Sequence, residues 1–209
     1  MSHLPFRELL ATPGVREVCT LRGRLGFMAY HGGSLEVMTD VIASQAAERS
    51  GASYYGVLQP AGHQHHIPSH RVSPLDSAHL RGFLHHVDTV ITIHGFGRHG
   101  YWTSLLLGGQ HRRLAHHVAE HLREGLPDYH VETDLDRIPR ELRGLHRDNP
   151  VNLPRHHGVQ IELPPMVRGQ APHAEALIDA LTAASTTWVG ASASPPVRVG
   201  ERRSGSSPA

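Results

Sequence analysis

Lysine is absent from the 209 residues of this chain, and cysteine occurs once, as Cys19. A single cysteine cannot form an internal disulfide, so the fold has to be held together by its core. All 20 basic residues are arginine, and with 19 acidic residues they give a formal net charge of +1. A chain this close to neutral is not expected to bind nucleic acid through bulk charge.

Long apolar runs are also missing. No segment reaches the roughly 20 apolar residues needed to cross a bilayer, and the first residues, MSHLPFRE, lack the apolar centre of a secretory signal. We therefore expect a cytoplasmic protein without a membrane partner. Residues 1–188 are long enough for one α/β domain, and the small, polar stretch 189–209 is expected to be a disordered tail.

Apolar and amphipathic segments alternate along the rest of the chain. The apolar segments predict strands at 26–30, 53–58, 89–93, 104–107, 129–133 and 158–163, and the amphipathic ones predict helices at 35–50, 76–87, 111–124 and 174–181. This alternation is typical of an α/β domain with a mixed, mostly parallel sheet flanked by helices.

Histidine, in contrast, is abundant, with 20 residues. His31 follows the strand predicted at 26–30, and two glycines then separate it from Glu36. Glycine adopts positive φ without a Cβ clash, so this turn can bring both side chains to one point. Imidazole nitrogen and carboxylate oxygen are zinc ligands, and a catalytic zinc site uses about three protein ligands. His31 and Glu36 are therefore candidate zinc ligands.

A second histidine is placed in the same way. His94 follows the β-branched strand predicted at 89–93 and precedes Gly95. Ligand sites in open α/β sheets lie at the carboxyl ends of the strands, so His94 is the candidate third ligand. Four further histidines gather in the irregular segment 59–74, which we interpret as a loop near the site, either solvated or binding metal by itself: His63, His65, His66 and His70.

One carboxylate stands inside an apolar strand. Glu162 lies in the strand predicted at 158–163, where a charge is costly unless it is paired, hydrogen-bonded or functional. The sequence therefore marks Glu162 as a candidate functional residue.

The His-Gly-Gly sequence at 31–33 is also similar to the oxyanion loop of lipase-like serine hydrolases. Those enzymes need a Gly-x-Ser-x-Gly nucleophile elbow. The chain contains no such pentapeptide, which disfavours a serine hydrolase.

Together these segments resemble the poly-γ-glutamate hydrolase family, zinc-dependent enzymes whose fold is similar to that of zinc carboxypeptidases. The resemblance rests on motifs in the family's order: YHGGSLE at 30–36, HIPS at 66–69, IHG at 93–95, and NPVN at 149–152 leading to GVQIEL at 158–163. It implies a zinc carboxypeptidase-like fold, a zinc ion held by His31, Glu36 and His94, and Glu162 as the general base that activates water.

The resemblance also implies a polymeric or small γ-glutamyl substrate, whose carboxylates need positively charged or polar partners. The residues predicted to bind it belong to the motifs or flank them: His66, Ser69, Arg71, Arg98, Asn152, Arg155 and Arg168. One departure concerns the residue after Asn152, which is usually arginine in the family and is Leu153 here. Either Arg155 substitutes for that arginine or the substrate differs.

Other functions fit the same residues. A related zinc amidohydrolase or carboxypeptidase could cleave peptides or N-acyl amino acids with this site. A non-catalytic, histidine-rich metal-binding protein is the alternative from another class, and it predicts several metal ions per chain. The sequence is compatible with any oligomeric state.

Overall fold

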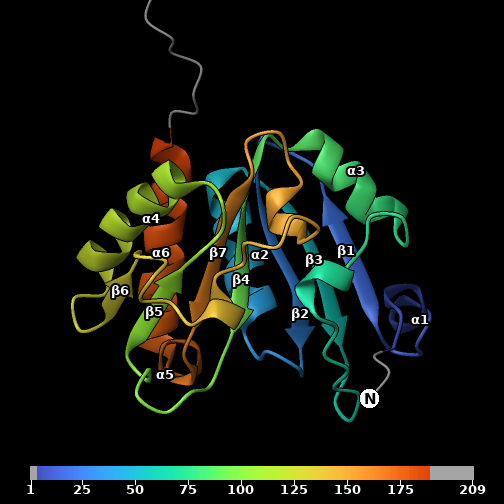
Figure 1. Cartoon of the computed structure of the whole chain (residues 1–209), viewed down its shortest axis with the longest axis horizontal. Coiled ribbons are helices and arrows are strands. Elements are labelled where there is room, and N and C mark those ends of the chain that lie inside the picture. The colour runs from blue at the N-terminus through green and yellow to red at the C-terminus, as the bar shows by residue number, and fades with distance from the viewer. Residues whose placement is uncertain (1–3, 189–209) are drawn as a thin grey trace, which may run out of the picture.

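The computed structural model describes residues 4–188, which form a seven-stranded sheet with helices on both faces (Figure 1). The predicted tail lies outside the described residues. The strands are β1 (Arg16–Thr20), β2 (Leu25–Gly33), β3 (Ser53–Gln59), β4 (Thr89–Gly95), β5 (Ser104–Leu107), β6 (His130–Glu132) and β7 (Gly158–Leu163). The helices are α1 (Phe6–Leu10), α2 (Thr39–Ser50), α3 (Ala78–His86), α4 (Arg112–Gly125), α5 (Pro165–Gly169) and α6 (Ala171–Thr187), with short 3-10 turns η1 (Ser69–Arg71), η2 (Arg140–Leu142) and η3 (Pro150–Asn152).

The strand order across the sheet is β1-β3-β2-β4-β7-β5-β6. The four central strands, β3, β2, β4 and β7, are parallel to one another, whereas β1 pairs antiparallel with β3 and β5 pairs antiparallel with β7. The predicted mixed, mostly parallel sheet is therefore confirmed. Because β2, β4 and β7 are parallel neighbours, their carboxyl ends meet at one edge of the sheet.

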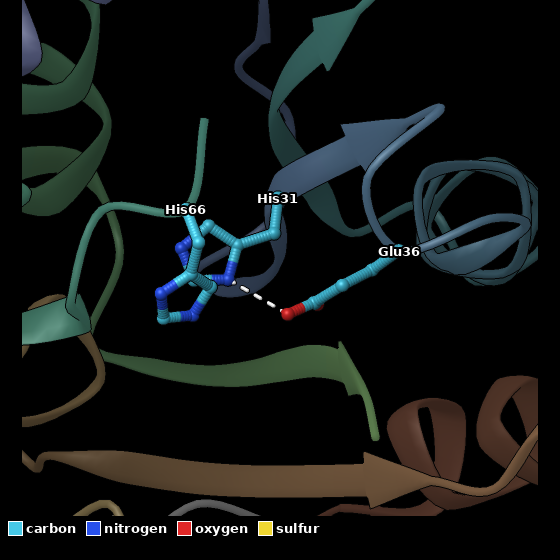
Figure 2. A group of neighbouring side chains, drawn as sticks. All are labelled: His31, Glu36 and His66. Atoms are coloured by element: carbon cyan, nitrogen blue, oxygen red, sulfur yellow. Dashed lines mark hydrogen bonds and ion pairs between the residues drawn. The ribbon is translucent and has the colours of Figure 1, made fainter. Parts of the chain in front are cut away.

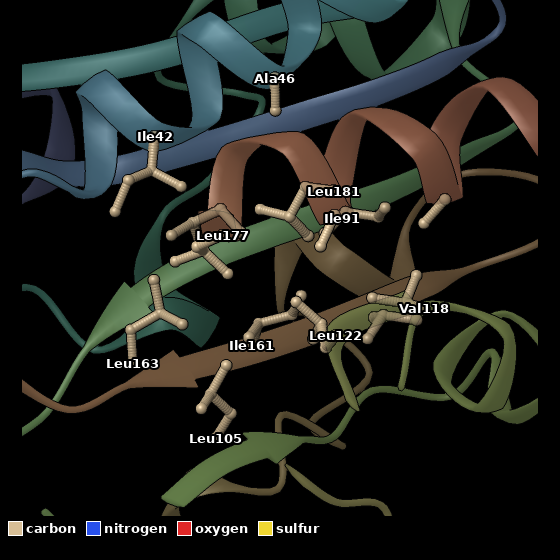
Figure 3. Close-up of a cluster of buried hydrophobic side chains, with 14 of the residues drawn as sticks. Ile42, Ala46, Ile91, Leu105, Val118, Leu122, Ile161, Leu163, Leu177 and Leu181 are labelled. Atoms are coloured by element: carbon tan, nitrogen blue, oxygen red, sulfur yellow. The ribbon is translucent and has the colours of Figure 1, made fainter. Parts of the chain in front are cut away.

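Two apolar clusters cover the two faces of the sheet. On one face α2, α4 and α6 pack against the strands, as Ile42, Ile91, Leu122, Ile161 and Leu177 illustrate (Figure 3). The other cluster includes side chains from α1, α3, β2, β3 and β4. Successive side chains of a strand point to opposite faces, so side chains that alternate with the first cluster in β4 and β7 lie on the second face.

No helix within residues 4–188 is long and apolar enough to cross a membrane.

The helix after β2 begins later than its apolar spacing predicts. Met38 has φ 73°, so the backbone is not helical there and α2 begins only at Thr39. Val37 belongs to the predicted helical pattern but is 56% exposed. Residues 34–38 therefore form a turn, and Glu36 projects from that turn. The predicted end of the helix at residue 50 is confirmed, and Gly51, with φ 71°, follows as its C-cap.

Candidate metal centre

The three predicted ligands converge at the carboxyl edge of β2 and β4. Oε1 of Glu36 lies 2.9 Å from Nδ1 of His31, and Oε2 lies 3.4 Å from Nδ1 of His94. The backbone N–H of Gly95 donates to the same Oε2 at 2.9 Å. The three side chains are buried, with 2%, 9% and 3% of His31, Glu36 and His94 exposed. One carboxylate thus bridges two imidazoles that come from separate strands.

The turn at Gly32–Gly33 returns Glu36 to His31. Gly33 has φ +72°, and a Cβ at this position would lie 2.3 Å from the carbonyl oxygen of Gln59, so glycine is required there. The N–H of Gly33 donates to Oδ1 of Asp40 at 3.0 Å, and the N–H of Glu36 donates to the carbonyl of His31 at 3.0 Å. These bonds close the turn.

Hydrogen bonds on the far side of each ring orient the two imidazoles. Nε2 of His31 lies 2.8 Å from the carbonyl oxygen of Ile67, which can only accept, so Nε2 carries the proton. Nε2 of His94 lies 3.0 Å from the Tyr30 hydroxyl, whose own proton goes to Oδ1 of Asn149 at 3.1 Å. Both rings therefore direct Nδ1 toward Glu36. Two such nitrogens and a carboxylate are a donor set that fits zinc.

A loop histidine approaches the same point. His31, Glu36 and His66 each offer a ligand atom, and these atoms lie within 4.8 Å of one another. Figure 2 shows the three side chains pointing toward one another. The ring of His66 lies 4.7 Å from that of His31, but His66 is exposed whereas His94 is buried. The structure thus presents two candidates for the third donor, one from the sheet and one from the loop.

Glu162 lies beside His94 in the sheet register of β4 and β7, and only 4% of it is exposed. The side-chain amide of Gln160 donates to its Oε1 at 2.8 Å. Glu162, a buried carboxylate expected to need a partner, therefore has a hydrogen-bond partner in Gln160.

The charges at this edge shift one another's pKa values. Burial raises the pKa of Glu36, but the two imidazoles outweigh it and hold the pKa well below its ordinary value. Burial lowers the pKa of His94, and the charge of Glu36 outweighs it, so the pKa is raised. For Glu162, burial raises the pKa, the charge of His94 lowers it and that of Glu36 raises it, which leaves it above its ordinary value. Glu36 is thus favoured as a carboxylate, whereas Glu162 takes up a proton more readily.

A cavity of about 500 Å³ opens onto these groups. Two residues predicted to bind substrate, His66 and Ser69, line this cavity. The other polar residues that line it are His31, Glu36, His70, His94, Arg140, Glu141, His146, Asn149, Gln160 and Glu162. The predicted ligands, the predicted base and part of the predicted substrate site therefore share one cavity.

The four arginines predicted to bind substrate are not part of this cavity wall. Arg168 is half-buried, and its Nε donates to the carbonyl of Leu163 at 3.1 Å. Arg98 pairs with Glu141 at 2.5 Å, and Arg155 lines a different pocket with Arg24. Arg71 ends the η1 turn and is exposed. Their assignment as substrate ligands gains no support from the shape of the cavity.

Asn152 is buried behind the cavity wall. Its side-chain amide donates to the carbonyls of Gly144 and His146, at 2.7 and 3.0 Å. Its Oδ1 accepts from the N–H of Gln110 at 3.2 Å. Asn152 therefore holds in place the loop whose residues Gly144 and His146 line the cavity.

Sequence reasoning missed Arg140, the arginine that does line the cavity. It begins the η2 turn, between the strands predicted at 129–133 and 158–163. An arginine in an irregular segment with no periodic pattern gives no signal that distinguishes it from the chain's other arginines.

Comparisons with known proteins identify the family and the fold of this chain. The sequence model described as poly-gamma-glutamate hydrolase matches residues 8–177. A bacteriophage poly-gamma-glutamate hydrolase superposes with a TM-score of 0.71 and 19% identity, covering 83% of this chain and 89% of the other. The zinc-free apo form of YNDL gives a TM-score of 0.71 and 17% identity, covering 83% and 90%. No curated protein matches by sequence.

A metallo-carboxypeptidase from Burkholderia cenocepacia aligns more weakly, with a TM-score of 0.46 and 10% identity over 85% of this chain and 65% of the other. The two structures with a TM-score of 0.71 establish the fold, and the sequence model covers most of the described residues. The chain belongs to the poly-γ-glutamate hydrolase family.

Proposed function

We propose that this chain is a zinc-dependent amide hydrolase that cleaves γ-glutamyl bonds. The observation that carries the proposal is the meeting of His31, Glu36 and His94 with the carboxylate of Glu162 in one cavity of about 500 Å³. Family membership supports hydrolysis and this substrate class.

The metal would be held by Nδ1 of His31, the carboxylate of Glu36 and Nδ1 of His94. When bound, zinc supplies a Lewis acid that polarises the scissile carbonyl and lowers the pKa of water. Burial suits these donors to the role, because a dry, low-dielectric surrounding strengthens the attraction between the carboxylate and a cation. His66, whose ring lies 4.7 Å from that of His31, is the alternative third donor.

Glu162 acts as the general base in this proposal. It accepts a proton from the attacking water as the C–O bond forms, and it returns that proton to the departing amine as the C–N bond breaks. A raised pKa suits a group that has to hold a proton between these steps. The hydrogen bond from Gln160 keeps one oxygen of the carboxylate occupied and leaves the other for water.

Arg140 is the residue we assign to a substrate carboxylate. It is exposed and lines the cavity, and within residues 4–188 its side chain makes no hydrogen bond or ion pair. A guanidinium in that state can form a bidentate pair with a carboxylate without giving up another partner. Arg98, in contrast, is already paired with Glu141.

The test combines metal analysis of the purified chain with incubation against γ-linked and α-linked glutamate oligomers. We expect about one tightly bound zinc per chain and cleavage of the γ-linked oligomers, abolished by a chelator and restored by zinc. Equal cleavage of α-linked oligomers would assign the chain to ordinary peptides. Several weakly bound metals with no cleavage of either set would favour a metal-binding protein.

A further inference from the structure

A row of buried hydrogen bonds joins His94 to Glu162. Nε2 of His94 lies 3.0 Å from the hydroxyl of Tyr30, which donates to Oδ1 of Asn149 at 3.1 Å. The side-chain amide of Asn149 donates to Oε1 of Gln160 at 2.9 Å, and the amide of Gln160 donates to Oε1 of Glu162 at 2.8 Å. Each of these five residues is at most 4% exposed.

The donor and the acceptor of each hydrogen bond in the row are fixed. An ionised Glu162 can only accept, so the NH₂ group of Gln160 donates to it and the carbonyl oxygen of Gln160 is left to accept. Asn149 must then donate through its NH₂ group and accept through Oδ1, which takes the proton of the Tyr30 hydroxyl. With its proton given to Asn149, the Tyr30 oxygen can only accept from Nε2 of His94, which faces it. Nε2 must therefore carry a proton, which in the neutral ring leaves Nδ1 of His94 unprotonated.

The sheet explains why these groups line up. Tyr30 lies in β2, His94 in β4, and Gln160 and Glu162 in β7, three parallel neighbours. Gln160 and Glu162 are two residues apart and point to the same face of the sheet. Asn149 comes from the segment between β6 and β7, where it caps η3 by accepting a hydrogen bond from the N–H of Val151.

We infer that Tyr30, Asn149 and Gln160 are positioning residues that fix two groups at once: His94 as a ligand through Nδ1, and Glu162 as an acceptor. This inference rests on the proposed function, because it assigns His94 and Glu162 their roles. Cutting the row next to His94 should weaken metal binding, since outer hydrogen bonds to a ligating imidazole typically contribute about 10–100-fold in metal affinity. Cutting it between Asn149 and Gln160, on the Glu162 side, should slow turnover and leave metal affinity unchanged.

The row can be cut separately at the His94–Tyr30 bond and at the Asn149–Gln160 bond. Tyr30→Phe removes the hydroxyl that accepts from His94. Asn149→Asp keeps the acceptor for Tyr30 but loses the donor to Gln160. Tyr55→Phe is the matched control, because the buried hydroxyl of Tyr55 donates to Glu17 at 2.6 Å and belongs to no part of the row.

The measurements are the zinc dissociation constant by chelator competition, kcat on γ-linked oligomers, and the His94 tautomer by ¹⁵N NMR of metal-free protein at about pH 9. For Tyr30→Phe we expect about 10–100-fold weaker zinc binding and transfer of the His94 proton from Nε2 to Nδ1, where Glu36 accepts it. For Asn149→Asp we expect zinc affinity within about threefold of wild type and kcat at least about 10-fold lower. Tyr55→Phe should match wild type in all three measurements.

The inference is overturned if Tyr30→Phe binds zinc as tightly as Tyr55→Phe and retains the wild-type tautomer. It is also overturned if Asn149→Asp keeps full kcat, a test that stands even where Tyr30→Phe does not fold. A wild-type chain that binds no zinc would instead refute the proposed function, and the tautomer of His94 in the metal-free protein would still decide whether the hydrogen-bond row holds that ring.

Discussion

Glu36 sits between two imidazoles, and this arrangement keeps a buried carboxylate ionised. Oε1 faces His31 at 2.9 Å, and Oε2 faces both His94 and the N–H of Gly95. A carboxylate buried without such partners would be neutral at physiological pH. The ionised form that these three partners favour is the form of a carboxylate that binds a cation.

Replacing Glu162 with glutamine tests whether Glu162 is the general base. We expect Glu162→Gln to lose about 10²–10⁴-fold in kcat, because general-base catalysis contributes that much, and to keep its zinc. The control is Glu141→Gln, which also removes a carboxylate from the wall of this cavity. The only interaction lost is an exposed ion pair with Arg98, so kcat should change by less than about threefold. Normal turnover by Glu162→Gln would remove Glu162 from this role.

The pairing of Glu36 with His94 gives the metal-free protein a pH-dependent stability. The pKa of Glu36 is lowered on folding, so its contribution is present above the unfolded value of about 4.3 and is lost as pH falls through the folded pKa. The pKa of His94 is raised on folding, so its contribution is present below about 6.5 and is lost as pH rises through the folded pKa.

We therefore predict that the stability advantage of metal-free wild type over His94→Ala is largest between about pH 4.5 and 6.5 and shrinks toward pH 9. Urea unfolding in the presence of a chelator measures it. The control is His85→Ala, which removes an exposed histidine from the end of α3. An advantage that grows with pH above 6.5 would contradict the assigned direction of the His94 shift.

His31 and His94 could be singled out from the sequence because each ends an apolar segment, and Glu162 because it interrupts one. Glu36 could be singled out because a glycine turn links it to His31. Tyr30 and Gln160 could not, since a tyrosine or glutamine inside a strand has no feature that separates a structural role from a role at the site. Their hydrogen bonds depend on Asn149, more than 100 residues from Tyr30 along the chain. Only the folded structure shows that relation.

At the scale of elements, the turn between β2 and α2 decides where Glu36 lies. The apolar spacing of Leu35, Val37 and Met38 predicted helix there, but Val37 is exposed and Met38 has positive φ. Apolar periodicity reports burial only when the residues face a core. The glycine pair gave the better indication, because the predicted tight turn does contain a positive φ, at Gly33.

Two glycines with nearly the same φ allow a controlled test of this turn. Gly33→Ala should destabilise the protein by more than about 3 kcal/mol, because left-handed backbone costs about 1–2 kcal/mol and the new Cβ would also meet the carbonyl of Gln59 at 2.3 Å. Gly51→Ala, with φ +71° and nothing within 4 Å of its Cβ, should show only the backbone cost. If urea unfolding shows that both variants lose the same unfolding free energy, the contact with Gln59 adds no cost at Gly33.

At the scale of the whole molecule, the site exists because β4 lies between β2 and β7. The strands themselves could be predicted from their apolar segments, and a parallel sheet follows from their alternation with helices. The order of strands could not be predicted, because strand pairing depends on contacts between distant segments. The resemblance to the family predicted the fold class, which the structure confirms, but not the order of the strands.

A metal that joins separate strands should stabilise the whole fold. At free zinc of about 1,000 times the dissociation constant, binding adds about 4 kcal/mol, which for a domain of this size corresponds to a rise in Tm of about 8–16 °C. Thermal unfolding with zinc and with chelator measures the difference. His31→Ala should lose most of this rise, and a full rise in that variant would place the zinc elsewhere.

The position of the metal tests the account most directly, and anomalous diffraction at the zinc edge locates it in crystals of the zinc-loaded chain. We predict one strong peak between Nδ1 of His31, the carboxylate of Glu36 and Nδ1 of His94, with Glu162 facing it across the cavity. A peak bound by His66 with His94 turned away would contradict the assigned ligand set, and a peak outside this cavity would contradict the proposed site altogether.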